Sequence, residues 1–306
     1  MKVILAISAL FCLGLGSCNL AKWNQNRLTK KFDRHDVTEA VLDTNGHSIH
    51  YFEGGNIEGD VILLIHGFGG DAQVTWNKTI VDLSDEYRII APDLLWFGES
   101  ISNHSANIYA QIDAMGLLLD HLKVDTFSVA GISYGGFVTM GLVQTREDQV
   151  DKMVIIDSPG ITYDVNLLDS MVVKTRVDEV SDIFVPKSPN EVQFLLDFAS
   201  YKNKNVPKGI LEDAYELYFS KNHEQLRQLL ISLPSQKDEF LKRGYQTELD
   251  AYVLWGEFDE VFPITEAQKL SAYLNAELLV IRKAGHAPNL ERYRDFEKKF
   301  RSCLDN

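Results

Sequence analysis

The sequence predicts an α/β fold, with a mostly parallel sheet flanked by helices and a helical segment inserted near the middle of the chain. Short, uniformly apolar runs alternate with amphipathic helical patterns along most of the sequence, which is typical of parallel strands buried on both faces. The alternation stops between residues 160 and 248, where apolar residues recur at helical spacing. Gly131-Ile132-Ser133-Tyr134-Gly135 lies between a strand pattern and a helix pattern. These three observations predict one α/β core that carries a helical lobe.

Composition excludes several classes of protein. The chain has 306 residues, 45% of them hydrophobic, and a chain of this length buries a large core without disulfide or metal support. Its formal net charge of −14 argues against nucleic acid as a partner, because a phosphate-binding face needs an excess of Lys and Arg. The 3 cysteines cannot build a disulfide framework, and no Cys-x-x-Cys pair is present to hold zinc.

Residues 1–17 have the features of a targeting segment. Lys2 is followed by an apolar run over residues 3–15, which has the length of a signal peptide and is short for a membrane span. The segment ends in Leu15-Gly16-Ser17-Cys18, which resembles a bacterial lipobox, so we expect cleavage before Cys18 and a lipid on that cysteine. This predicts attachment to a bacterial membrane in the cell envelope, facing the extracytoplasmic side. A plain signal peptide or an uncleaved anchor is the alternative.

Residues 18–36 are mostly polar, and we expect them to form a solvated tether between the lipid and the folded domain. Attraction of their cations to anionic lipid head groups is the secondary interpretation. These cations are Lys22, Arg27, Lys30, Lys31 and Arg34.

The core is expected over residues 37–159 and 249–306. Asn45-Gly46 predicts a hairpin between strands at 37–42 and 49–52, because both residues tolerate positive φ. Further strands are predicted at 61–65, 87–91, 127–130, 153–156, 252–255 and 278–281, and helices at 109–122, 137–144, 266–274 and 290–300. The segment 160–248, with no buried-strand run and several prolines, is predicted to be mostly helical.

Ser133 is the predicted nucleophile. A Gly-x-Ser-x-Gly motif between a strand and a helix forms a tight turn that exposes the serine hydroxyl at the carboxyl end of the sheet. The helix amino terminus beside it favours a developing negative charge. The motif alone is weak evidence, and its strand–turn–helix setting makes it specific.

A serine hydroxyl needs a base, and the order expected for this arrangement is serine, then an acid, then histidine. His286 follows the last strand pattern, and Asp259 follows the preceding one, so both are expected at the same edge of the sheet as Ser133. Asp157, which ends another strand pattern, is the alternative acid, whereas Glu257 lies at the end of the strand itself.

The glycine-rich run His66-Gly67-Phe68-Gly69-Gly70 follows another buried strand pattern. It predicts an oxyanion hole formed by the backbone N–H groups of Phe68 and of Tyr134, the residue after the nucleophile. We expect His66 to brace this loop rather than to take part in the reaction. The glycines match neither phosphate-binding pattern, because Gly-x-x-x-x-Gly-Lys and Gly-x-Gly-x-x-Gly are both missing.

Over about residues 45–300 the sequence resembles the α/β-hydrolase superfamily. The resemblance rests on HGFGG (66–70), APDLLWFGES (91–100), GISYGG (131–136), WGEFDEVFP (255–263) and AGHAPNLERY (284–293). It implies an eight-stranded sheet and a cap at 160–248, inserted after the sixth strand and lying over a Ser133–Asp259–His286 triad. Leu95 and Trp96 depart from the more frequent form of the second motif and resemble a branch similar to monoacylglycerol lipases and plant hydrolases.

The predicted function is hydrolysis of carboxylic esters, such as acylglycerols or similar small apolar acyl esters, through an acyl-enzyme. No metal or organic cofactor is expected. Trp96 and Phe97, with Phe68, Tyr134 and apolar cap residues, are candidates for the acyl pocket. One alternative is a carbon–carbon or amide bond hydrolase with the same triad, although carbon–carbon hydrolases often carry Asn where Ile132 stands. Another alternative is a lipid-anchored binding protein that has lost catalysis.

Overall fold

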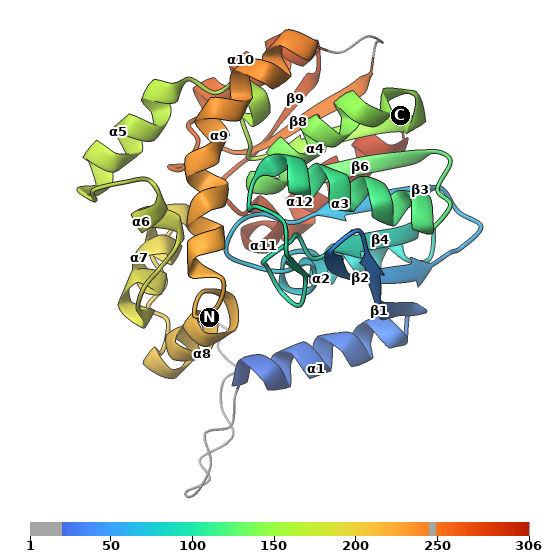
Figure 1. Cartoon of the computed structure of the whole chain (residues 1–306), viewed down its shortest axis with the longest axis horizontal. Coiled ribbons are helices and arrows are strands. Elements are labelled where there is room, and N and C mark those ends of the chain that lie inside the picture. Colours follow the sequence, from blue (N-terminus) through green and yellow to red (C-terminus); the bar gives the residue numbers. More distant parts are fainter. Residues whose placement is uncertain (1–19, 245–248, 306) are drawn as a thin grey trace, which may run out of the picture.

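The computed structural model describes residues 20–244 and 249–305. Its sheet has the strand order β1-β2-β4-β3-β6-β7-β8-β9 (Figure 1), in which β1 and β2 are antiparallel and β4, β3 and the strands beyond are mutually parallel. The strands are β1 Val37–Thr44, β2 His47–Gly55, β3 Val61–Ile65, β4 Arg88–Pro92, β5 Ile101–Ser102, β6 Phe127–Ile132, β7 Val150–Ile156, β8 Asp250–Gly256 and β9 Glu277–Ile281. The predicted mostly parallel α/β sheet is therefore confirmed.

The hairpin at the edge of the sheet confirms the turn predicted from Asn45-Gly46. Both residues have positive φ, 47° and 79°, and Thr44 pairs with His47 across the turn. Two successive positive φ values match the twist of the flanking strands, which is why Asn-Gly specifies this connection.

The sheet differs from the expected eight strands by one short addition, because nine strands lie within the described residues. Strand β4 pairs with β2 only from Tyr51 to Gly55, which leaves the edge of His47 and Ser48 open on that side. The two residues of β5 pair with this remaining edge. A two-residue strand has no periodicity that a sequence pattern can reveal.

Helices cover both faces of the sheet. On one face, α3 (Ile108–His121), α4 (Tyr134–Arg146) and α10 (Ile264–Leu274) pack against residues such as Leu63. On the other face, α1 (Leu20–Asp33), α2 (Ala72–Leu83) and α12 (Tyr293–Asp305) pack against residues such as Ile62. Neighbouring residues of a strand point to opposite faces, so each central strand must be apolar throughout.

The carboxyl-terminal helix predicted over residues 290–300 is divided in two. The short α11 (Pro288–Glu291) ends at Arg292, whose φ of −130° interrupts the helix before α12 begins. Phe300 of α12 stacks with Trp76 of α2 at a ring distance of 6.5 Å, and both side chains are buried.

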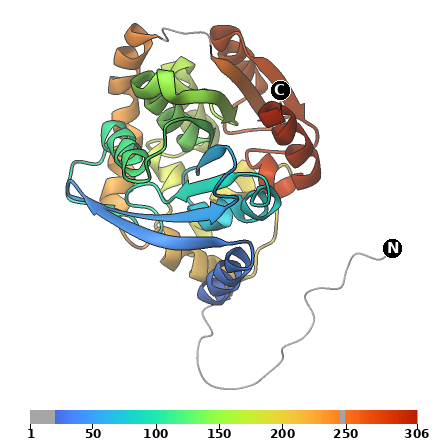
Figure 2. The same ribbon diagram turned by 90° about the vertical axis from the view of Figure 1, so that its right-hand side faces the viewer.

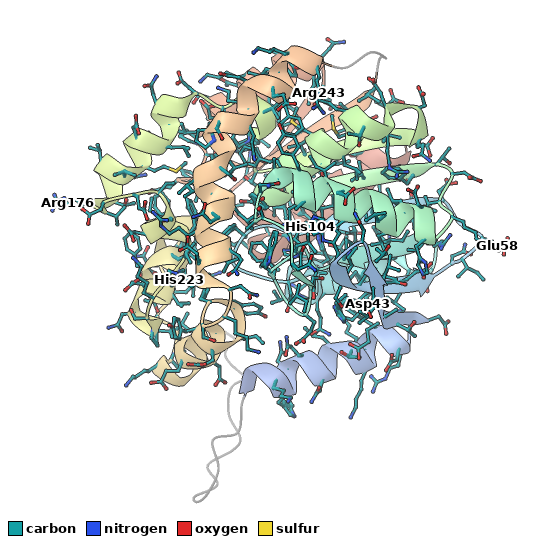
Figure 3. The ribbon with its side chains drawn as sticks, viewed as in Figure 1. Asp43, Glu58, His104, Arg176, His223 and Arg243 are labelled. Atoms are coloured by element: carbon teal, nitrogen blue, oxygen red, sulfur yellow. The ribbon has the colours of Figure 1, made fainter. Side chains whose placement is uncertain are left out.

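The segment between β7 and β8 is helical where it is described, as predicted. It contains the 3-10 turn η2 (Gly160–Thr162) and helices α5 (Val165–Thr175), α6 (Ser181–Phe184), α7 (Pro189–Ala199), α8 (Lys208–Tyr218) and α9 (His223–Arg243). These helices gather on one side of the sheet (Figure 1). Arg176, at the end of α5, points away from the body of the molecule (Figure 3).

The expectation of a solvated tether over residues 18–36 is wrong for its described part. Residues 20–33 form α1, which lies beneath the hairpin (Figure 2) and contacts β1. Phe32 is fully buried, Leu28 is 7% exposed, and the Phe32 ring meets Phe52 edge-on at 5.2 Å. Two apolar residues four positions apart make one narrow stripe, which the surrounding polar residues obscure in the sequence.

The predicted signal segment and Cys18 lie outside the described residues. Among residues 20–244 and 249–305, no helix has both the length and the apolar character that a membrane crossing requires.

Removing the Phe32 side chain tests whether α1 belongs to the fold. Phe32→Ala is expected to lower the free energy of unfolding by about 3–5 kcal/mol, because it empties a fully buried site. Urea unfolding followed by circular dichroism measures the loss, and Lys30→Ala on the exposed face of α1 is the control. Equal stability of the two variants would mean that the segment is a tether after all.

Candidate active site

Ser133 occupies a strained turn between β6 and α4. Its backbone angles are φ 53° and ψ −121°, a conformation that costs free energy for a residue with a side chain. A Cβ atom on Gly131 would lie 2.1 Å from the Thr139 hydroxyl, and one on Gly135 would lie 2.4 Å from the carbonyl oxygen of His66. Only glycine fits at both positions, so the motif predicted from the sequence is required by packing.

Asp259 and His286 meet Ser133 at the carboxyl edge of the sheet. The Nε2 atom of His286 lies 2.7 Å from the Ser133 hydroxyl oxygen, and its Nδ1 atom lies 2.8 Å from Oδ2 of Asp259. These residues follow β6, β8 and β9, whose parallel arrangement brings their carboxyl ends together. The three residues nominated from the sequence are therefore one hydrogen-bonded chain.

Backbone contacts hold this chain in place. The other oxygen of Asp259 accepts hydrogen bonds from the N–H groups of Val261 and Phe262, at 2.8 and 2.9 Å. The backbone N–H of His286 donates to the carbonyl of Ala199 in α7, at 2.8 Å. The histidine loop is thus tied directly to the helical segment that covers the site.

The geometry determines how His286 can act. An ionised Asp259 beside Nδ1 favours the tautomer with its proton on that nitrogen, which leaves Nε2 free to accept the proton of Ser133. This arrangement can raise the nucleophilicity of the hydroxyl and can stabilise the imidazolium that forms.

Asp157, the alternative acid, lies beside Asp259 rather than on His286. It is fully buried, has a positive φ of 42°, and accepts a hydrogen bond of 2.7 Å from the Gly256 N–H. Burial, together with the charge of Asp259, holds the pKa of Asp157 well above its ordinary value. Asp157 is therefore the neutral member of a buried carboxyl pair, and it can donate its proton in a hydrogen bond to Asp259.

Asp157, Asp259 and His286 also form the described group whose potential ligand atoms lie close enough together for a metal ion. Both ring nitrogens of His286 are already engaged, one by Ser133 and one by Asp259. The chemistry of this donor set therefore fits proton transfer rather than metal binding.

His66 braces the glycine-rich loop, as expected. Its Nε2 atom accepts a hydrogen bond from the Leu94 N–H at 2.9 Å, and its Nδ1 atom lies 2.7 Å from the Gly67 carbonyl oxygen. Complete burial lowers the pKa of His66, so the ring is neutral and donates from Nδ1.

Phe68 and Tyr134 lie beside the nucleophile. A Cβ atom on Gly67 would lie 3.0 Å from Cβ of Ser133, so the loop passes close to the hydroxyl. The Phe68 and Tyr134 rings meet edge-on at 5.8 Å, and both residues line the cavity next to Ser133. Their backbone N–H groups belong to the two segments that the sequence nominated for an oxyanion hole.

A narrow apolar cavity extends from Ser133 under the helical segment. Its volume is about 40 Å³, room for only a few water molecules. An acyl chain would therefore need the helices to move apart. Its walls come from the core and from η2, α5, α6 and α9, and they comprise Phe68, Ser133, Tyr134, Phe137, Tyr163, Leu168, Met171, Val180, Phe184, Leu230, Leu233, Val261 and Phe262.

Trp96 and Phe97, nominated for this pocket, are not on its walls. Phe97 packs behind the wall, with its ring 4.9 Å from Phe68 and 5.4 Å from His66. The indole of Trp96 donates to the Ser102 carbonyl at 3.4 Å, on the side of β5. Trp96 also has a φ of 68°, and this backbone conformation sets the direction of the loop.

The residues that replace them come mostly from the helical segment. Tyr163, Met171, Phe184, Leu230 and Leu233 were not singled out by the sequence. Apolar residues at helical spacing are the only signal they carry, and that signal does not separate a cavity wall from ordinary core.

The chain was compared with known proteins. A family model described as alpha/beta hydrolase fold matches residues 60–293. Lipase 1 of Psychrobacter immobilis is 26% identical over 98% of this chain and 98% of its own length. A 2-hydroxy-6-oxo-2,4-heptadienoate hydrolase of Pseudomonas putida is 23% identical over 85% of this chain and 92% of its own. The solved structure of lip1 from Acinetobacter baumannii superposes with a TM-score of 0.80 at 21% identity, covering 97% of this chain and 98% of that one.

Asp157→Asn tests the assignment of the neutral carboxyl group. Above the ordinary pKa of 3.8, an aspartate ionises in the unfolded chain but stays neutral in this site, so stability falls as pH rises. The amide keeps both hydrogen bonds and does not ionise. We therefore expect a higher melting temperature than wild type at pH 7, with a difference that shrinks toward pH 3. A lower melting temperature at pH 7 would show that Asp157 is a charged partner.

Comparing the turnover of Asp157→Asn with that of Asp259→Asn tests which of the two acids acts on His286. Asp157→Asn is expected to keep turnover within about tenfold of wild type, whereas Asp259→Asn should lose on the order of 10⁴ in kcat, since it favours the wrong tautomer of His286. Turnover of an aryl acetate measures both, and a reversal of the order would contradict the assignment.

Proposed function

Because the chain belongs to the alpha/beta hydrolase fold family, we propose that it cleaves carboxylic esters with Ser133 as the nucleophile. The observation that carries the proposal is the hydrogen-bonded chain of Ser133, His286 and Asp259 at the mouth of an apolar cavity. The likeness to Lipase 1 over nearly the whole of both chains supports an ester as the substrate.

The reaction starts when the Ser133 oxygen attacks the ester carbonyl while His286 Nε2 takes the hydroxyl proton. Asp259 stabilises the imidazolium across the 2.8 Å contact. The tetrahedral intermediate collapses to an acyl-enzyme as His286 returns the proton to the leaving alcohol. A water molecule, deprotonated by His286, then attacks the acyl carbon, and His286 returns this proton to the Ser133 oxygen as the acid is released.

The negative charge on the former carbonyl oxygen is stabilised by the backbone N–H groups of Phe68 and Tyr134. Each such donor typically lowers the barrier by about 3 kcal/mol. The Tyr134 N–H lies at the first turn of α4, where the helix dipole adds to its effect.

An acyl chain would lie in the apolar cavity beneath the helical segment. Its walls carry almost no polar surface apart from the Ser133 and Tyr hydroxyls, so an uncharged acyl group of an acylglycerol or similar ester fits its chemistry. The residues 160–248 act as the cap, and their opening would set the rate of substrate entry.

The place of action follows from the amino-terminal sequence. Residues 1–17 serve as a signal peptide, and Cys18 receives a lipid that holds the enzyme on a bacterial membrane, facing the extracytoplasmic side.

Hydrolysis of a carbon–carbon bond in a dienoate is the second candidate. The likeness to 2-hydroxy-6-oxo-2,4-heptadienoate hydrolase over 85% of this chain favours it. The presence of Ile132 before the serine, where such enzymes often have Asn, argues against it.

Labelling with a fluorophosphonate probe tests the nucleophile. Wild-type protein should label, and Ser133→Ala should not, because the reagent reacts only with an activated hydroxyl. The variant should also lose on the order of 10⁶ in kcat toward esters. A folded wild-type protein that fails to label would favour a binding protein that has lost catalysis.

A substrate panel then separates the two hydrolase candidates. We expect turnover of aryl esters and monoacylglycerols, and little turnover of a ring-cleavage dienoate. Conversion of the dienoate without conversion of any ester would overturn the ester proposal.

Substitution of Leu230 tests whether the cavity receives the acyl chain. Leu230→Trp should fill the cavity and cut kcat/KM for a long-chain ester by about 100-fold, while an acetate ester changes little. Ile231→Trp on the same helix is the matched control, because Ile231 is 38% exposed and does not line the cavity. Equal effects on both chain lengths would contradict this placement of the acyl chain.

A further inference from the structure

A basic hollow lies between α1 and α2, away from the Ser133 cavity. Its volume is about 720 Å³, and no carboxylate is among its lining residues. We define the basic hollow by its five cations and one aromatic residue: Arg27, Lys30, Lys31, Arg34, Lys78 and Trp23.

None of the five cations of the basic hollow forms an ion pair within the described residues. The ion pairs within residues 20–244 and 249–305 use other Lys and Arg side chains, such as Arg88, Lys187 and Arg301. This is unusual in a chain with a formal net charge of −14, where carboxylates are abundant. Five cations that lie close together and outside any described ion pair favour an anionic ligand.

Trp23 adds an apolar component to the same surface. It is 63% exposed, and the guanidinium of Arg27 lies 5.7 Å from the centre of its ring. Exposed indole rings next to basic side chains are favoured where water meets the head groups of a membrane.

The opposite side of α1 is fixed to the core, so the basic face has a constant direction. Leu28 and Phe32 are buried, Gln25 donates to Asp71 at 3.4 Å, and Gln73 donates to Thr29 at 2.9 Å. The helix lies at the edge of the molecule (Figure 1), and side chains extend from it away from the sheet (Figure 3).

We propose that the basic hollow docks onto anionic phospholipid head groups, with Trp23 at the level of those head groups. No carboxylate lines the hollow and none of its cations is in a described ion pair. Its positive charge therefore complements the negative charge of the head groups. The proposal depends neither on the hydrolase chemistry nor on a lipid at Cys18.

Docking through this surface also orients the enzyme. Helix α1 packs against α8 of the cap, and Asp71, which accepts from Gln25, caps α2 just after the glycine-rich loop. The α8 edge of the cap therefore lies next to the docked face, so a substrate from the membrane would approach the cap over a short distance.

Vesicle binding by the full chain tests the proposal. Cys18→Ser removes the acceptor of a lipid, and binding is compared on phosphatidylcholine vesicles with and without about one third phosphatidylglycerol. Because the amino-terminal run is the same in every sample, the ratio of the two affinities isolates the electrostatic contribution. We expect anionic vesicles to bind more tightly, with most of the difference lost in about 0.5 M NaCl.

Substitutions test whether the basic hollow causes the preference for anionic vesicles. Neutralising Lys30, Lys31 and Arg34 to Gln should weaken binding to anionic vesicles roughly 100-fold, about fivefold for each charge. Neutralising Lys123, Lys242 and Lys283 to Gln removes the same charge elsewhere and should change binding by less than about threefold. Trp23→Ala should weaken binding to both kinds of vesicle. Circular dichroism reports that each variant is folded, which keeps this test independent of the test of the active site.

Two outcomes would overturn the proposal. Equal losses in the two triple variants would mean that only net charge matters. Displacement from vesicles by millimolar inorganic phosphate at constant ionic strength would identify a site for a free anion rather than a membrane surface.

Discussion

The turn at Ser133 is the constraint on which the active site depends. Its positive φ is kept only because Gly131 and Gly135 let α4 and the His66 loop approach β6 within contacts that any Cβ atom would block. That close approach places the Phe68 segment beside the hydroxyl. The parallel sheet positions the other two residues. The loops after β8 and β9 leave the same edge of the sheet as Ser133, which brings Asp259 and His286 within hydrogen-bond distance of each other and His286 within hydrogen-bond distance of Ser133. The parallel order of the strands thus fixes the relative positions of Ser133, Asp259 and His286.

A second constraint lies directly beneath that site. Asp157 and Asp259 are buried side by side, and burying two negative charges together would cost far more than their hydrogen bonds return. A proton on Asp157 removes this electrostatic repulsion. It leaves Asp259 as the charged member facing His286, with two backbone N–H groups on its other oxygen. The position of an acid in the sequence therefore does not reveal its charge, which the surrounding dielectric and its neighbour decide.

The core and the cap meet at the Ser133 cavity, and α1 contacts both of them. The cap supplies about half of the cavity walls and holds the His286 loop through Ala199, so the position of His286 depends on that of α7. Helix α1 contacts the cap on one side and the hairpin on another, while Arg27, Lys30 and Lys31 on its outer face line the basic hollow. One helix thus joins the fold, the cap and a surface suited to anionic head groups.

The sequence by itself determined the eight longer strands of the core, the Asn45-Gly46 turn, the helical cap and the chain of Ser133, His286 and Asp259. These features depend on local patterns: apolar runs, glycines where no Cβ fits, and polar residues placed just after strands. Only the tertiary structure decided that residues 20–33 are a packed helix, that Trp96 and Phe97 lie off the cavity wall, and that Asp157 stands beside Asp259 rather than on His286. Each of these depends on contacts between residues far apart in the chain, where burial and neighbouring charge outweigh any local preference.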